Sequence, residues 1–204
     1  MSEKNIGIVI LAGGCSSKLG TPKQLVEFKG KSLLRNATEV ALRCSCEHVI
    51  VVLGSRANEI YKEISDLPVE TVINGEWTKG ISTSLKAGLV KLMQSNPDVS
   101  AAVVMLSDQP FVSEKTVRSL IEDYGQSGNP IVASEYDGVL GVPALFDREV
   151  FDELLALQGD AGARVVIRKS EPSRIAAVKA PEAAFDVDTP ADHQRLKELE
   201  FKSR

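Results

Sequence analysis

Residues 6–31, IGIVILAGGCSSKLGTPKQLVEFKGK, form the stretch that decides the fold. Residues 6–12 are a short apolar run rich in Val and Ile, which is typical of a parallel strand buried on both faces of its sheet. Gly13 and Gly14 follow directly, and glycines let successive backbone N–H groups turn toward one anion. The residues after them add hydroxyl donors and positive charge: Ser16, Ser17, Lys18, Thr21 and Lys23. The stretch therefore predicts a strand that ends in an anion-binding loop.

The composition favours one α/β domain spanning residues 1–204. The chain has 204 residues and is 43% hydrophobic, which is enough to bury a substantial core. A formal net charge of −4 argues against sequence-independent nucleic-acid binding, because neutralising phosphates requires a concentrated basic surface. The sequence shows no signal-peptide pattern and no apolar stretch of about 18 residues, so we expect a cytoplasmic protein with no membrane partner.

The cysteines do not form a disulfide framework in a chain of this length, because they are three in number and closely spaced: Cys15, Cys44 and Cys46. Cys44 and Cys46 resemble half of a metal site. No second Cys or His pair completes it, since His48 and His193 are far apart in the sequence. We therefore expect reduced structural thiols.

Apolar runs alternate with helical patterns along the rest of the chain. Strands are expected at residues 48–53, 69–73, 101–106, 131–134 and 174–178. Helix starts are expected at Ser32, Asn58, Ser82 or Thr83, Ser113, Asp147 and Pro190. This alternation predicts a mainly parallel, mixed central sheet covered by helices on both faces. Pro143 lies in a strand-like segment, where it indicates either a place outside the central ladder or a bulge.

Carboxylates follow strand-like segments at two places. Asp108 comes directly after the run 101–106, and ligands of open α/β sheets bind outside the carboxyl ends of the strands. Asp186 and Asp188 point the same way if their segment is extended. Carboxylate oxygens suit Mg²⁺, so these three acids are candidate metal ligands. The alternatives are an Asp-initiated turn before Pro110 and a structural role for Asp188 at a helix start.

The first loop matches neither GxxxxGK[ST] nor GxGxxG. Instead, LAGGCSSKLGTPKQL resembles the LA(A/G)GxSxRMGxxK signature of the nucleotidyltransferases that include the molybdenum-cofactor guanylyl- and cytidylyltransferases, the MobA-like family. The segment 74–88 resembles NPxWxxGMxxSLxxG. Later segments resemble further motifs of that family: SDQP at 107–110, GVPALF at 141–146, GDAGAR at 159–164 and DVDTPAD at 186–192.

This resemblance implies a Rossmann-like, Mg²⁺-dependent nucleotidyltransferase that moves CMP or GMP from a nucleoside triphosphate to the phosphate of a molybdopterin-type acceptor, releasing pyrophosphate. It also admits a recipient molybdoenzyme as a partner. The implied catalytic residues are Lys23 and Asp108. The implied nucleotide-binding residues are Leu11, Ala12, Gly13, Gly14, Ser16, Lys18, Gly20, Lys23, Gly80, Ser82 and Ser84. The implied acceptor-binding residues are Gln109, Pro143, Asp160 and Arg164.

Two departures leave the choice of substrates open. The Arg-Met pair of the first family motif is Lys18-Leu19 here, so a bidentate guanidinium is replaced by a point charge. LAGG leans toward guanosine nucleotides, whereas Pro22-Lys23, the Trp77 segment and GDAGAR lean toward cytidine nucleotides. The alternatives are nucleotidylyl transfer to a sugar phosphate or other small molecule, and a non-catalytic accessory protein that binds the cofactor for a molybdoenzyme.

Overall fold

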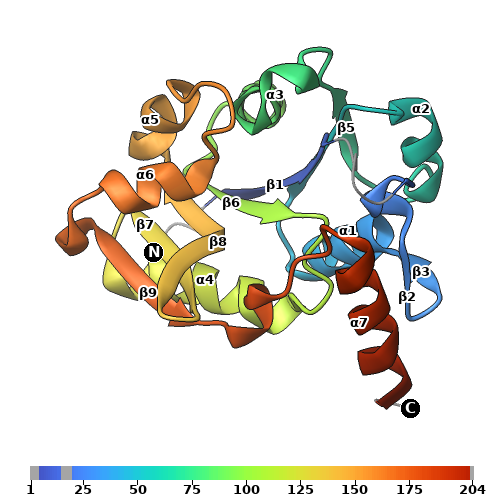
Figure 1. The fold of residues 1–204 in the computed structure, drawn as a ribbon. Helices are drawn as coiled ribbons and strands as arrows, with labels where there is room; N and C mark the ends of the chain where they lie inside the picture. The colour runs from blue at the N-terminus through green and yellow to red at the C-terminus, as the bar shows by residue number, and fades with distance from the viewer. Residues whose placement is uncertain (1–4, 15–19, 203–204) are drawn as a thin grey trace.

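The computed structural model describes residues 5–14 and 20–202, which form a central sheet between two layers of helices (Figure 1). The sheet has seven strands in the order β5-β4-β1-β6-β8-β7-β9. Their bounds are β1 Ile6–Ala12, β4 His48–Leu53, β5 Glu70–Ile73, β6 Ala101–Leu106, β7 Ile131–Tyr136, β8 Val139–Asp147 and β9 Ile175–Lys179. All neighbouring pairs in this sheet are parallel except those that β8 makes with β6 and β7. The predicted mainly parallel, mixed sheet is confirmed.

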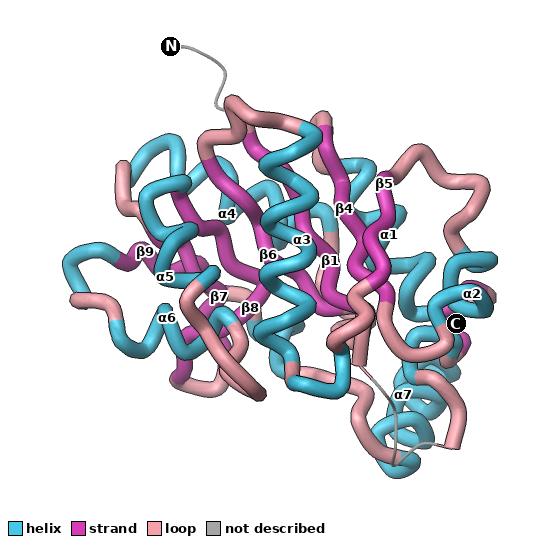
Figure 2. Tube along the Cα trace, turned by 90° about the horizontal axis from the view of Figure 1, so that it is seen from above, coloured by secondary structure: helices cyan, strands magenta, loops and turns pink. Residues whose placement is uncertain are grey.

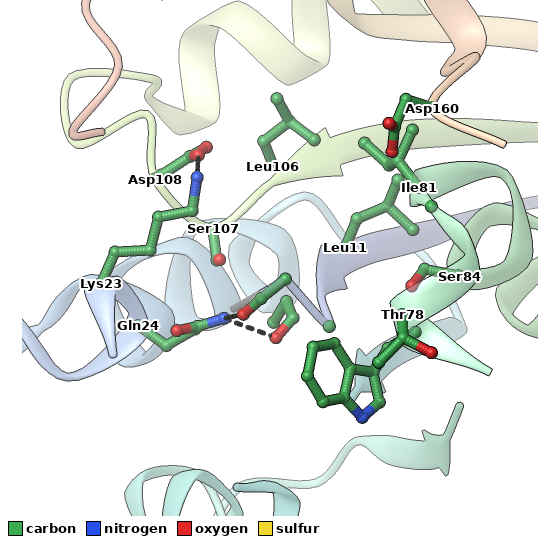
Figure 3. Close-up of a pocket in the computed structure, with 15 residues that line it drawn as sticks. Leu11, Lys23, Gln24, Thr78, Ile81, Ser84, Leu106, Ser107, Asp108 and Asp160 are labelled. Atoms are coloured by element: carbon green, nitrogen blue, oxygen red, sulfur yellow. Dashed lines mark hydrogen bonds and ion pairs between the residues drawn. The ribbon is translucent and has the colours of Figure 1, made fainter. Parts of the chain in front are cut away.

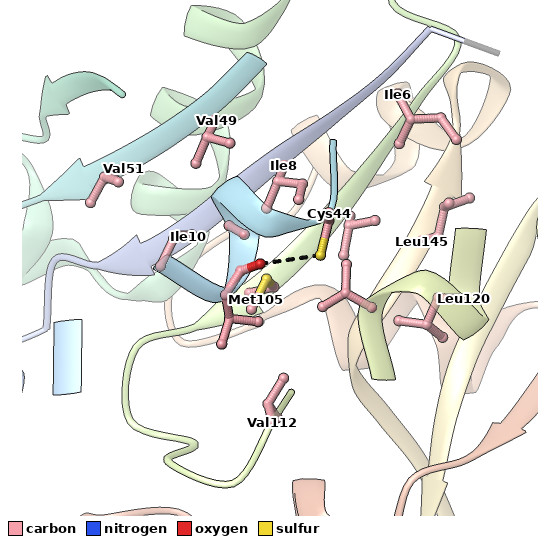
Figure 4. Close-up of a cluster of buried hydrophobic side chains, with 14 of the residues drawn as sticks. Ile6, Ile8, Ile10, Cys44, Val49, Val51, Met105, Val112, Leu120 and Leu145 are labelled. Atoms are coloured by element: carbon pink, nitrogen blue, oxygen red, sulfur yellow. Dashed lines mark hydrogen bonds between the residues drawn. The ribbon is translucent and has the colours of Figure 1, made fainter. Parts of the chain in front are cut away.

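The apolar residues of β1 divide between the two helical layers. Ile8 and Ile10 pack in a cluster with α1 and α4, whereas Val9 and Leu11 pack in a cluster with α3, α5 and α6. Figure 2 shows α3 packed over the middle of the sheet and running along its strands, and Figure 4 shows part of the first cluster. The helix bounds are α1 Leu33–Arg43, α2 Ala57–Ile60, α3 Ile81–Ser95, α4 Glu114–Ser127, α5 Phe151–Leu155, α6 Ala163–Lys169 and α7 Pro190–Lys202. The expected double-sided burial of the first strand is confirmed, because every residue of β1 is buried.

A short two-stranded ribbon, β2 Glu27–Phe28 and β3 Lys31–Ser32, follows the first loop. Ser32 then caps α1 as predicted, since its side chain accepts a hydrogen bond from the N–H of Arg35. Ser113 likewise caps α4. Among the described residues, no helix is long and apolar enough to cross a membrane.

The prediction that Ser82 or Thr83 caps α3 is wrong. The helix begins at Ile81 with Gly80 as its N-cap, because Gly80 adopts φ 107°, a conformation that residues with side chains rarely take. The Ser82 N–H donates to the carbonyl of Gly159 at 3.1 Å, and the Thr83 hydroxyl donates to the carbonyl of Gly80 at 2.8 Å. Both residues therefore belong to the first turn of the helix.

Two other expectations are refined. Pro143 lies inside β8, and the pairing of β7 with β8 shifts register between Ala133 and Ser134, so the bulge is the correct alternative. The helix expected after Asp147 is divided into a 3₁₀ turn, Arg148–Val150, and the short α5. Cys44 and Cys46 are free thiols, and burial raises their pKa to about 12 and about 11, which suits structural cysteines.

Candidate active site

A cleft of about 490 Å³ opens where β1 and β6 end, at the carboxyl edge of the parallel strands (Figure 3). This is the edge at which open α/β sheets bind ligands. The lining residues come from the first loop, the start of α3, the end of β6 and the 159–162 loop. They are Leu11, Ala12, Gly13, Gly14, Lys23, Gln24, Trp77, Thr78, Gly80, Ile81, Ser84, Leu106, Ser107, Asp108 and Asp160.

The backbone of the first loop is held by the side chain of Gln24, which is 1% exposed. Its Nε2 donates to the carbonyls of Ala12 at 2.7 Å and Gly14 at 2.9 Å. In a trans peptide the N–H points opposite to the C=O, so the N–H of Gly13 is directed away from Gln24. Gln24 thereby fixes the peptide orientation of the glycine loop. Sequence reasoning missed this role, because nothing in the local pattern distinguishes Gln24 from a surface polar residue.

Lys23 lies between two of the predicted metal-binding carboxylates. Its Nζ donates to Asp108 Oδ2 and, at 2.8 Å, to Asp188 Oδ1. Burial lowers the pKa of this ammonium, but the charges and hydrogen bonds of Asp108 and Asp188 outweigh burial and raise it to about 12. Lys23 is therefore a fully charged cation at neutral pH and offsets part of the negative charge of Asp108 and Asp188.

Asp186 and Asp188 do not line the cleft, but a backbone hydrogen bond of Val187, the residue between them, holds their segment beside Asp108. The N–H of Val187 donates to the carbonyl of Asp108 at 3.0 Å, and the Val187 side chain is buried while both acids are exposed. Desolvation by the surrounding protein raises the pKa of Asp186 to about 6, and the negative charges of Asp108 and Asp188 add to this effect. The charges of Asp108 and Asp188 therefore act on Asp186, and the three acids form one group of negative charge.

The donor set fits a hard divalent cation that takes part of its coordination from a substrate. Asp108 Oδ1 is buried and has no hydrogen-bond partner in the part of the chain that the structure describes, so one oxygen of this carboxylate is left for a ligand. Within residues 5–14 and 20–202, no three His, Cys, Asp or Glu side chains are grouped to hold a metal by themselves. Mg²⁺ commonly uses one or two carboxylates plus phosphate oxygens. Asp108 with Asp186 or Asp188 meets that requirement.

The opposite wall of the cleft depends on close contact between the start of α3 and the 159–162 loop. A Cβ on Gly80 would lie 2.3 Å from the carbonyl oxygen of Gly159, so this approach requires glycine. Because the Ser82 N–H also binds that carbonyl, the loop is fixed against the helix start, and Asp160 lines the cleft. The GDAGAR segment is therefore part of the site wall.

The remaining predicted residues fall into three groups. Ser16 and Lys18 lie outside the described residues. Gly20 and Ser82 do not line the cleft, although Ser82 supports its wall. The predicted acceptor residues also lie outside the lining, apart from Asp160. The lining residues that the sequence reasoning did not assign are Gln24, Trp77, Thr78, Ile81, Leu106 and Ser107.

Gln109 and Pro143, two of the predicted acceptor residues, lie close together after β6 and in β8. Gln109 Nε2 donates to the carbonyl of Val142 at 3.2 Å, directly before Pro143, and to that of Ala183 at 2.8 Å. The Tyr136 hydroxyl donates to the same Val142 carbonyl at 3.2 Å. Burial raises the pKa of Tyr136, the charge of Asp186 adds to the rise, and the exposed Arg164 opposes it. Gln109 and the Val142–Pro143 peptide are thus in contact, and Asp186 and Arg164 are the main charged groups that act on Tyr136 beside them.

Comparisons with known proteins point to one family. The model of the MobA-like NTP transferase domain matches residues 8–175. A Paenarthrobacter nicotinovorans protein named nicotine blue oxidoreductase is 30% identical over 197 residues, which cover 92% of this chain and 94% of that protein. A crystal structure of an Rv0371c homologue from Mycobacterium sp. strain JC1 has a TM-score of 0.84 and 31% identity, covering 98% of this chain and 99% of that chain. The manganese complex of Mycobacterium tuberculosis Rv0371c has a TM-score of 0.76 and 30% identity, covering 95% of this chain and 97% of that chain.

Proposed function

Because the chain belongs to the MobA-like NTP transferase domain family and is therefore a nucleotidyltransferase, we propose that it transfers CMP or GMP from a nucleoside triphosphate to the phosphate of a molybdopterin-type acceptor, with release of pyrophosphate. The observation that carries the proposal is the cleft in which the glycine loop, Lys23 and Asp108 meet. A triphosphate needs donors and positive charge along its oxygens, and these elements supply both.

The reaction requires an acceptor phosphate oxygen to attack the α-phosphorus in line with the departing pyrophosphate. The glycine loop, oriented by Gln24, holds the triphosphate, and Lys23 neutralises negative charge as pyrophosphate leaves. Mg²⁺ would be held by Asp108 with Asp186 or Asp188, and when bound it supplies charge stabilisation to the phosphate oxygens. The manganese in the Rv0371c structure supports a divalent cation in this family. No covalent nucleophile is needed.

Both nucleotides remain candidates. The LAGG sequence of the first loop favours GMP transfer, and the Trp77 and GDAGAR segments favour CMP transfer. Trp77 and Asp160 line the cleft, so the two segments that favour cytidine contribute directly to its wall. We therefore propose CTP as the first nucleotide to test.

The test is an activity matrix of four nucleoside triphosphates against molybdopterin-type and sugar-phosphate acceptors, with pyrophosphate release as the readout. We expect release that depends on a molybdopterin-type acceptor, a divalent cation and either CTP or GTP, and not on ATP or UTP. The control is Asp108→Asn, which keeps the side-chain volume but removes the charge. Turnover with sugar phosphates alone would replace the proposed acceptor, and tight cofactor binding without turnover would support the accessory-protein alternative.

The name of the Paenarthrobacter relative favours a second candidate, oxidation or reduction of a small molecule. The first loop does not match the GxGxxG pattern of dinucleotide-binding folds, which argues against it. The discriminating experiment follows NADH and NADPH absorbance in the presence of quinone-like and dye-like acceptors. Steady oxidation that survives in Asp108→Asn would favour this second candidate.

A further inference from the structure

Asn74 directly follows β5 and is 5% exposed. Its side chain connects the turn at Glu76 to the first turn of α3. Nδ2 donates to Thr83 Oγ1 at 2.8 Å and to Ser84 Oγ at 2.9 Å. Oδ1 accepts from the N–H of Glu76 at 2.9 Å. A backbone N–H is only a donor, so the atom that faces Glu76 must be the amide oxygen. The orientation of the carboxamide is thereby fixed, and both of its contacts to α3 are donations.

These contacts determine where the two hydroxyl protons point. The Thr83 hydroxyl has two backbone acceptors, the carbonyl of Gly80 at 2.8 Å and that of Glu76 at 3.1 Å, so its proton points to the backbone and away from Asn74. The Ser84 oxygen already accepts from Asn74, and a hydroxyl has one proton to donate. No acceptor for that proton is recorded among residues 5–14 and 20–202. The Ser84 hydroxyl lines the cleft, so its donor capacity is left for a ligand (Figure 3).

The position of Ser84 restricts which part of a ligand it meets. Figure 3 shows Ser84 across the cleft from Lys23 and Asp108, which form the charged end. A Cβ on Gly13 would lie 2.7 Å from Ser84 Oγ, so the loop and the hydroxyl are in close contact only because residue 13 is glycine. Ser84 is itself 4% exposed, so its hydroxyl is a donor that is almost completely shielded from solvent.

We propose that Asn74 is a positioning residue that holds the Ser84 hydroxyl as a hydrogen-bond donor for the nucleoside portion of the nucleotide. The nucleoside must then present an acceptor, such as a carbonyl oxygen or an unprotonated ring nitrogen, at this point of the cleft. The inference rests on the proposed function, because it assumes that the cleft binds a nucleotide.

The decisive variant is Asn74→Asp, which preserves shape but replaces the donating Nδ2 with an acceptor. An aspartate would accept from the Ser84 hydroxyl and turn its proton away from the cleft. We expect Asn74→Asp and Ser84→Ala each to weaken nucleotide binding by about two- to tenfold, the range of one net hydrogen bond. The double variant should bind no more weakly than Ser84→Ala alone, because Asn74 acts through Ser84.

The measurement is calorimetric titration with the best nucleotide of the activity matrix, with thermal unfolding recorded for each variant. Asn74→Ala repeats the cycle without a new buried charge, in case Asn74→Asp does not fold. The matched control is Asn96→Asp. Asn96 follows α3 at the other end of the sheet, is 7% exposed and donates from Nδ2 to Asn5 Oδ1 at 2.7 Å. It should lower the melting temperature and leave nucleotide affinity unchanged.

The outcomes separate the inference from the proposed function. Losses that multiply in the double variant, or Asn74 variants that bind like the wild type, would overturn the positioning role while the proposed function stands. A wild-type protein that binds no nucleoside triphosphate would overturn the proposed function, and the positioning role with it. A double variant equal to Ser84→Ala, with an unaffected Asn96→Asp control, supports the inference.

Discussion

Replacing Lys23 with methionine should destabilise the protein, because it removes the cation that joins Asp108 to Asp188. The pKa of Lys23 rises from the ordinary 10.5 to about 12. At 1.36 kcal/mol per pKa unit, the shift corresponds to about 2 kcal/mol. A raised lysine pKa means that this stabilisation is fully present below pH 10.5 and is lost as the pH rises through about 12. An experiment at neutral pH therefore measures its whole value.

For a chain of this size, ~2 kcal/mol corresponds to a fall in melting temperature of roughly 4–8 °C. The assay is thermal unfolding followed by circular dichroism in EDTA and again in millimolar Mg²⁺. Lys23→Met leaves the Asp108 carboxylate, which is 6% exposed, without its cation. A divalent cation bound by the same oxygens should recover part of the loss, and should raise the melting temperature of the variant more than that of the wild type.

Lys79→Met is the matched control. Lys79 also forms an ion pair, with Glu76, but both side chains are more than half exposed, so water and salt screen the pair and it contributes little to stability. Equal melting temperatures for the two lysine variants in EDTA would refute the magnitude worked out for Lys23. If Mg²⁺ does not change the melting temperature of Lys23→Met, the assignment of a divalent cation to the Asp108 carboxylate is refuted.

Three further predictions concern the cleft and the thiols. Asp108→Asn should abolish most pyrophosphate release at saturating Mg²⁺ while leaving the circular dichroism spectrum unchanged, because it removes charge and not volume; wild-type kinetics would exclude Asp108 as a metal ligand. Gly80→Ala should cost about 1–3 kcal/mol in urea unfolding and weaken nucleotide binding, because φ 107° and the contact with the 159–162 loop both exclude a Cβ. Gly75→Ala should be neutral in both measurements, because a Cβ at residue 75 meets no atom of the described residues within 4 Å. In a Cys15→Ser variant, Cys44 and Cys46 should resist iodoacetamide at neutral pH until urea unfolds the chain, because burial keeps their thiols protonated. Rapid alkylation of the folded variant would show that burial does not protect them.

Local patterns were sufficient to predict the main elements of the fold. The Val- and Ile-rich run before Gly13 predicted β1 and its burial on both faces, and alternation of apolar runs with helical patterns predicted a mainly parallel sheet. The position of Asp108 after β6 also followed from the sequence, because the end of a strand is a local property. The cap of α3 was predicted wrongly, since the conformation of Gly80 accompanies a contact with Gly159, far along the chain.

The sequence by itself determined which segments surround the cleft, because periodicity and motif order depend on neighbouring residues. Only the tertiary structure decided how their side chains meet. Lys23 and Asp108 are 85 residues apart in the sequence, and their ion pair exists because β1 and β6 end side by side. The hydrogen bonds from Gln24 to the glycine loop, and those from Asn74 to α3, likewise depend on how distant segments pack. Such contacts arise from the arrangement of the whole chain, and a local pattern does not contain that arrangement.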